Sequence, residues 1–200
     1  MISKLSCKIV DLLIKQSIII KTEQELYVYG FFMLLSQIFY FIIALIFGIV
    51  FHVILESIIF YIAFQFIRRY AGGYHASTET KCEIMSSLSM ILCIATIKML
   101  SIHEFIIPLL IITTVAAASI FSLCPLDTPE KPLSKEEHKY YRKISWSILL
   151  IISAIIAICY CLKCNSILIP CCISLILEGI LIIAGKVKKL TQKTINDNNY

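Results

Sequence analysis

Long apolar blocks alternate with short polar segments along this chain. A membrane-spanning helix needs about 20 mostly apolar residues, because the hydrocarbon core of a bilayer is about 30 Å thick. Six blocks approach or exceed this length, at residues 29–51, 53–67, 84–100, 105–123, 144–162 and 166–185. The pattern predicts an all-α polytopic membrane bundle of about six transmembrane helices, which forms a single membrane domain over residues 1–200.

The second block leaves the number of spans open. It is short and contains Glu56 and Gln65, so it could be a full span, a tilted span or a re-entrant segment. Only His52 separates it from the first block, and residues 29–67 could therefore also form one long helix. That alternative reduces the bundle to four spans.

The segments outside the blocks are polar and mostly basic. Within residues 1–25, the first twenty place three lysines and an aspartate among apolar residues, which predicts an amphipathic helix in the membrane interface, with an ordinary packed helix as the alternative. This segment lacks the clean apolar stretch and the small-residue cleavage site of a signal peptide. Two polar loops, 68–83 and 124–143, and a basic tail, 186–200, complete the predicted layout.

Charge predicts an orientation for this layout. With the N-terminus inside, the inner segments of a six-span bundle hold 16 of the 18 Lys and Arg residues, and only Lys98 and Lys163 fall outside them. This asymmetry is what the positive-inside rule expects, so both termini and both polar loops are predicted to be cytoplasmic. The net charge of +5 is then an orientation signal. The expected partner is the lipid membrane, and no basic–aromatic motif for nucleic acid is present.

Composition limits where chemistry can occur. With 59% hydrophobic residues and a mean hydropathy of +0.88, the chain has no room for a separate catalytic domain. Most of the nine cysteines lie inside apolar blocks, where thiols behave as small hydrophobic groups. Cys161 and Cys164 have no His or carboxylate beside them, so we expect no metal site. Any chemistry must lie on loops and helix ends.

The first polar loop contains the best candidates. It includes Gly72 and Gly73, which permit unusual backbone angles, then His75, and Cys82 seven residues later. On one continuous helix, seven residues correspond to about 10.5 Å of rise, too far for a hydrogen-bonded nucleophile and base. A cooperating pair therefore requires a break in the backbone between them.

A helix start can supply this break. Residues 80–83 fit a capping box, with Thr80 as the N-cap and Glu83 at the third helical position. Cys82 would then lie in the first helical turn, where the helix dipole stabilises a thiolate. His75 could fold back from the loop as its base. The alternative is that both residues are merely structural.

Several polar residues could support such a pair. Arg68 and Arg69 are either interfacial anchors or ligands for a carboxylate. The group that orients His75 could be Gln65, Glu79 or Asp127, and the sequence does not choose among them. Glu56 and Glu178 lie within apolar blocks, where charged groups are costly. For the deeper Glu178, burial favours a protonated form or a polar partner.

At these residues the chain resembles the accessory gene regulator B (AgrB) family. The first loop reads RRYAGGYHA over residues 68–76, followed by Cys82, and the second loop is bracketed by prolines at positions 125, 129 and 132. The family commonly has Asn before the Lys-Pro of the second loop, where this chain has Glu130 before Lys131. Length, span count and basic tail extend the resemblance over nearly the whole chain.

The resemblance implies a bacterial plasma-membrane cysteine endopeptidase. Such an enzyme processes the precursor of a cyclic autoinducing peptide for quorum sensing, acts as a homodimer and needs no metal or cofactor. It implies that His75 and Cys82 are catalytic and that Arg68 and Gly73 support activity or folding, with Lys131 as a further binding candidate in the second loop. A peptide transporter or export partner and a non-catalytic scaffold are the alternatives, and an inert Cys82 would favour them.

Overall fold

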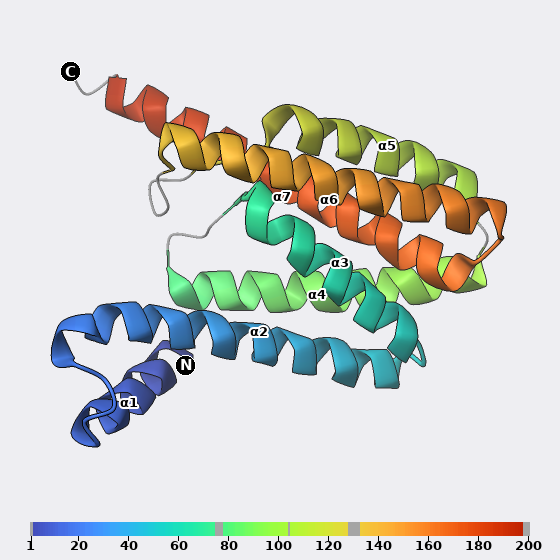
Figure 1. Cartoon of the computed structure of the whole chain (residues 1–200). Coiled ribbons are helices and arrows are strands. Elements are labelled where there is room, and N and C mark those ends of the chain that lie inside the picture. Colours follow the sequence, from blue (N-terminus) through green and yellow to red (C-terminus); the bar gives the residue numbers. More distant parts are fainter. Residues whose placement is uncertain (1, 75–77, 104, 128–132, 198–200) are drawn as a thin grey trace.

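The chain folds into a bundle of long helices (Figure 1). In this computed structural model the described residues are 2–74, 78–103, 105–127 and 133–197, without the side chains of 79, 192, 193 and 195–197. Over these ranges the elements are helical, and the one bridge between extended segments joins Gly72 to Leu126. The elements are α1 (Ile2–Lys15), the short 3-10 helix η1 (Lys21–Glu23), α2 (Gln24–Val50), α3 (Ile54–Ala71), α4 (Glu79–Ile102), α5 (Ile106–Leu123), α6 (Lys135–Cys161) and α7 (Asn165–Asp197). The all-α membrane bundle expected from the sequence is confirmed.

Five of the described helices are long and apolar enough to cross a membrane, namely α2, α4, α5, α6 and α7. The helix α3, where the sequence suggested a sixth span, is a separate helix of 18 residues. It includes Glu56, Arg68 and Arg69, which lower its hydropathy. It packs against α2, α6 and α7 inside the bundle. The alternative of one long helix over residues 29–67 is wrong, because the chain breaks at His52, where φ is +56°.

The last helix, α7, is the centre of the bundle. It packs against α3, α4, α5 and α6, and 67% of its apolar stretch is buried, against 28% or less for the other four candidate spans. A helix that is apolar on all sides is expected in such a position, since every face has a partner to bury against. The outward faces of α2, α4, α5 and α6 remain rich in exposed Leu, Ile and Phe, as contact with lipid requires.

Helix ends differ from the expected loop boundaries. The helix α3 continues through Arg68 and Arg69, which the sequence placed in the loop, and ends at Ala71. The helix α6 begins at Lys135 rather than near 144, because Ser134 and Glu137 form a capping box. The helix α7 continues from the apolar block into the basic tail, which contains no glycine or proline after position 185 to stop it.

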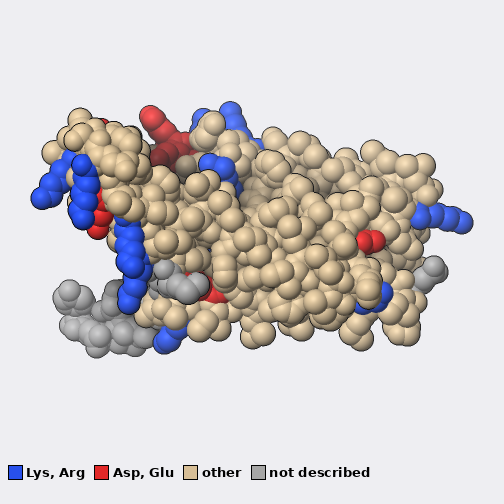
Figure 2. Space-filling model, turned by 90° about the horizontal axis from the view of Figure 1, so that it is seen from below, with Lys and Arg blue, Asp and Glu red and all other residues tan. Residues whose placement is uncertain are grey.

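Charged side chains gather at one end of the molecule. In Figure 2 most of the Lys and Arg on the visible face lie at the left-hand end, where Figure 1 places α1 and the C-terminus, and uncharged surface covers most of the length. The starts of α4 and α6 lie toward the same end (Figure 1). The two polar loops of the sequence are therefore at the basic end of the bundle.

Candidate functional site

The candidate site begins where α3 ends. Gly72 and Gly73 follow the helix with φ values of +78° and +129°, which only glycine adopts without strain. A Cβ atom on Gly73 would lie 2.0 Å from Nη1 of Arg68, so the close approach also excludes a side chain there. These two glycines turn the chain sharply out of α3, and Tyr74 leads it toward His75.

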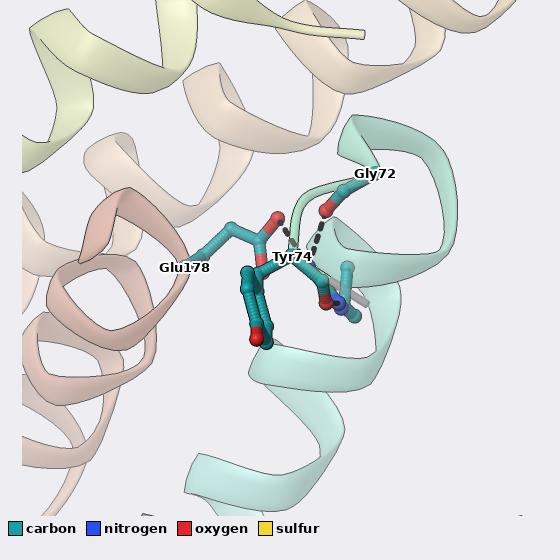
Figure 3. A network of polar contacts seen from close by, with 4 residues as sticks. Gly72, Tyr74 and Glu178 are labelled. Carbon is teal, nitrogen blue, oxygen red and sulfur yellow. Dashed lines mark hydrogen bonds and ion pairs between the residues drawn. The ribbon is translucent and has the colours of Figure 1, made fainter. Parts of the chain in front are cut away.

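Arg68 holds this turn from the last helical turn of α3. Its guanidinium donates hydrogen bonds to the carbonyl oxygens of Gly72 and Tyr74, the latter at 2.6 Å. Its Nη1 also lies 3.8 Å from Oε1 of Glu178, a fully buried residue of α7. Figure 3 shows Glu178 reaching from α7 toward the segment of Gly72 and Tyr74. Arg68 therefore links the turn to the central helix.

Backbone contacts fasten the same segment to α7 and to the second loop. The N–H of Tyr74 donates to the carbonyl of Leu181 at 2.9 Å, and the N–H of Leu126 donates to the carbonyl of Ala71 at 2.9 Å. Gly185 permits this packing, because a Cβ there would lie 2.8 Å from the Tyr74 nitrogen. The first loop thus passes between α7 and the second loop with its backbone tied to both.

Cys82 lies near the start of α4 but not in the capping arrangement expected from the sequence. The expectation of Thr80 as N-cap is wrong. The N-cap is Thr78, whose extended backbone lets its side chain accept from the Lys81 N–H at 3.4 Å. The helix begins two residues earlier, and Cys82 is its fourth residue, with its N–H donating to the Thr78 carbonyl at 3.0 Å. The thiol is half-buried.

Asp127 ties the second loop to the end of α7. Its Oδ1 accepts from Nζ of Lys189 at 2.7 Å, and both side chains are close to half exposed. The hydrogen bond from Lys189 lowers the pKa of Asp127 below its ordinary value. Within the described residues, this carboxylate pairs with Lys189, and its role as the group that orients His75 stays a prediction.

The remaining sequence candidates fall into two groups. Gln65 lies against the Tyr61 hydroxyl one turn earlier on α3, and Arg69 lies 6.0 Å from the centre of the Tyr70 ring. His75 and Lys131 lie outside the described residues, as does the side chain of Glu79. The structure therefore brings Arg68, Gly72 and Gly73 together and leaves the arrangement of the His75–Cys82 pair as a sequence prediction.

Sequence reasoning did not identify the residues of α7 that hold the first loop. Glu178 was expected to be protonated or to have a polar partner, but nothing in the pattern singled out Arg68, 110 positions away. Leu181 contributes through its backbone carbonyl, which no side-chain motif reveals. One signal was present for Gly185: a glycine in a helical, apolar stretch often marks a close approach of another chain segment.

Together, the apolar helices and the first polar loop define a class of protein. The chain is a multi-pass helical membrane protein with a half-buried thiol at a helix start and a backbone turn held by a buried ion pair. The family model described as accessory gene regulator B matches residues 6–183, and the chain belongs to this AgrB family. The family is linked to processing of the accessory gene regulator autoinducer.

Two curated relatives agree with this membership. Both are named only as AgrB-like proteins of Clostridium perfringens, one from strain 13 / Type A at 28% identity and one from strain SM101 / Type A at 27% identity. Each match covers 123 residues, which is 58% of this chain and 57% of the relative. The chain thus spans a little over half the length of the curated relatives it matches. No solved structure matches the chain.

Proposed function

We propose that this protein is a membrane cysteine endopeptidase that cleaves a precursor peptide and closes its product into a cyclic autoinducing peptide. The observation that supports it best is the position of Cys82, on the fourth residue of α4 and seven residues after His75, in a chain of the AgrB family. Cys124, the other thiol beside the polar loops, is buried, and burial raises its pKa.

The reaction follows from a thiol and an imidazole. His75 takes the Cys82 proton, and the thiolate attacks the scissile carbonyl carbon of the precursor. The bond to the amide nitrogen breaks, His75 protonates the leaving amine, and the N-terminal part remains as a thioester on Cys82. An internal Cys thiol or Ser hydroxyl of the bound peptide then attacks this thioester. A thiolactone or lactone ring forms, and the Cys82 thiol is regenerated with the attacking group's proton.

Water must be kept from the thioester for cyclisation to win over hydrolysis. Exposed Leu, Ile and Phe side chains cover the outward faces of the described helices, so a peptide bound at the helix starts would be covered partly by lipid and partly by the two loops. The side chains at the basic end of the bundle suit an acidic part of the precursor. No metal or cofactor is needed for any of these steps.

The test is cleavage of the precursor by protein reconstituted in liposomes. We expect the substrate to be a short amphipathic peptide with an acidic C-terminal part, encoded beside this chain. Cys82→Ala and His75→Ala should each reduce product formation by roughly three orders of magnitude or more, in line with loss of a nucleophile or its base. The matched control is Cys93→Ala, which removes a thiol from the interior of α4 and should leave processing unchanged. Parental processing by a folded, inserted Cys82→Ala variant would refute the proposal.

A further inference from the structure

We infer that Glu178 is a positioning residue for the proposed reaction: through Arg68 it fixes the Gly72–Tyr74 segment against α7 and so sets the direction in which the chain enters His75. The inference rests on the proposed function for its chemical consequence, but its structural part stands on contacts among described residues. Glu178 itself lies in the middle of α7 and touches neither loop backbone by a hydrogen bond.

Glu178 places a buried carboxyl group beside the guanidinium of Arg68. Its side chain is fully buried, and neither carboxylate oxygen has a hydrogen-bond partner in the described part of the chain. Among the described residues, the polar group nearest to this carboxyl group is the Arg68 guanidinium, with Nη1 3.8 Å from Oε1. A guanidinium stays protonated at every physiological pH, so it cannot escape burial by losing its charge. Glu178 is therefore placed to balance a cation that is itself only 19% exposed.

The guanidinium that Glu178 balances holds two backbone carbonyls. The Gly72 and Tyr74 oxygens both accept from Arg68, so one planar side chain bridges the residues on either side of Gly73. Without the carboxylate, the buried cation is uncompensated, and leaving such a charge unpaired is strongly unfavourable. Arg68 would then swing toward solvent and release both carbonyls. The segment that ends at His75 would lose its shape without losing the helices around it.

The arrangement on α7 supports this interpretation. Residues 178, 181 and 185 are spaced by three and four positions, so they lie on one face of the helix. Glu178 faces Arg68, the Leu181 carbonyl accepts from Tyr74, and Gly185 leaves room for the Tyr74 nitrogen. One helical face therefore provides a counter-charge, an acceptor and a space for the same short segment. A carboxylate that served only to stabilise the bundle would have no reason to lie in line with the two backbone contacts.

The experiment measures the segment directly in the full-length protein in nanodiscs. Hydrogen exchange at the Tyr74 amide reports its bond to Leu181, and the alkylation rate of Cys82 by iodoacetamide between pH 5 and 9 reports whether His75 still assists the thiol. Alkylation is measured in a variant that keeps Cys82 as its single cysteine. Glu178→Gln should speed exchange at Tyr74 by about tenfold or more and move the alkylation profile toward that of His75→Ala. Precursor processing should fall by about 10²-fold, mainly in kcat.

Two further variants separate positioning from stability. Glu56→Gln removes a half-buried carboxylate in the first turn of α3, at the far end of that helix from Gly72, and it should behave as the parent. In the double variant Arg68→Met, Glu178→Met, apolar side chains replace the ion pair, a change that often preserves or raises stability. The double variant should melt at a temperature no lower than that of Glu178→Gln. Its Tyr74 amide should nevertheless exchange as fast as in Glu178→Gln, and it should process the precursor as poorly, because the Gly72 and Tyr74 carbonyls still lack their donor.

Each outcome decides one point. Parental exchange at Tyr74 in Glu178→Gln overturns the inference, and so does slow exchange in the double variant. If Glu178→Gln does not fold, Glu178→Asp takes its place: the shorter side chain withdraws the carboxyl group from Arg68, and parental exchange at Tyr74 in this variant would overturn the inference. If exchange responds as expected but parent and His75→Ala alkylate alike, the proposed function fails while the anchoring role of Glu178 remains.

Discussion

A single missing side chain at position 185 lets the first loop lie on the central helix. A Cβ there would approach the Tyr74 nitrogen to 2.8 Å, the Gly73 carbonyl carbon to 2.9 Å and the Leu126 side chain to 2.6 Å. Two of these atoms are backbone, which cannot turn aside as a long side chain can. The residue therefore determines how closely both polar loops pack against α7.

We predict that Gly185→Ala displaces the first loop although alanine is the better helix former. The expected cost is about 1–3 kcal/mol of stability from overpacking, with a matching loss of processing. Gly30→Ala is the control, because a Cβ on Gly30 of α2 meets nothing within 4 Å. That change should be neutral or stabilising by up to about 1 kcal/mol. Thermal melting of both variants in the same detergent checks the pair, and equal melting of the two would contradict the assigned contact.

For single residues, the sequence predicted which residues are unusual better than it predicted which residues they contact. The glycine pair, Arg68 and an intramembrane Glu178 were recognisable as unusual residues, since each breaks a local rule of apolar helices. The contact between Arg68 and Glu178 was not predictable, because it depends on which face α7 turns toward α3. Pairings between residues far apart in sequence follow from packing, and no local pattern contains them.

Among the elements, the start of α4 controls where Cys82 lies. Two threonines, Thr78 and Thr80, precede Cys82, and only Thr80 is followed three residues later by the Glu of a capping box. The helix uses the first, which has the extended backbone that an N-cap requires. The sequence identified the helix and its approximate start correctly, but neither the capping residue nor the true ends of α3 and α6. The last one or two turns of a helix are only marginally stable, so contacts with the neighbouring loop decide at which residue the helix ends.

We predict that Thr78→Ala and Thr80→Ala differ in effect. Losing the true N-cap should cost about 0.5–2 kcal/mol and slow alkylation of Cys82, because the first turn frays. The exposed Thr80 makes no cap contact, so its replacement should change neither quantity. Iodoacetamide labelling of the single-cysteine protein measures both variants. A larger loss of stability or of labelling from Thr80→Ala than from Thr78→Ala would show instead that Thr80 is the N-cap.

The ion pair between the second loop and α7 predicts a pH dependence. Since Lys189 lowers the pKa of Asp127, the pair contributes stability at pH values above the ordinary Asp pKa of about 4, and this contribution is lost as pH falls through the lowered pKa. Both side chains are close to half exposed, so the contribution should be below about 1 kcal/mol. Melting curves from pH 6 to pH 3 should fall less steeply for Asp127→Asn than for the parent. Lys189→Met should match Asp127→Asn, and a parental slope in either variant would contradict the pairing.

On the scale of the whole molecule, the bundle has two chemically different ends. The hydrophobic pattern predicted the class of fold, and the apolar blocks correspond to helices throughout the described chain. The pattern could not show that α3, whose charged residues make it a poor candidate for a membrane span, packs among the other helices. Nor could it show that α7 is the central helix. Block hydropathy measures whether a helix prefers an apolar environment, and both lipid and other helices satisfy that preference.

We predict opposite labelling of two cysteines in intact cells. Cys161 is exposed at the end of α6 and Cys82 lies at the start of α4, at opposite ends of the bundle in Figure 1. If the basic end is cytoplasmic, a membrane-impermeant maleimide should label a variant whose single cysteine is Cys161. It should label one whose single cysteine is Cys82 only after the membrane is permeabilised. The reverse pattern would invert the orientation expected from the positive charges.

The central place of α7 has a consequence for biosynthesis. A ribosome makes α1 to α6 before α7, so the earlier helices enter the membrane while the helix they pack around is still missing. Until α7 inserts, Arg68 has no buried counter-charge and Tyr74 has no acceptor at Leu181. The loop that leads to His75 can therefore take its final shape only after synthesis has passed position 185. If the proposed function is right, a nascent chain without α7 would hold Cys82 and His75 without the framework that fixes Tyr74, and processing would begin only once α7 is in place.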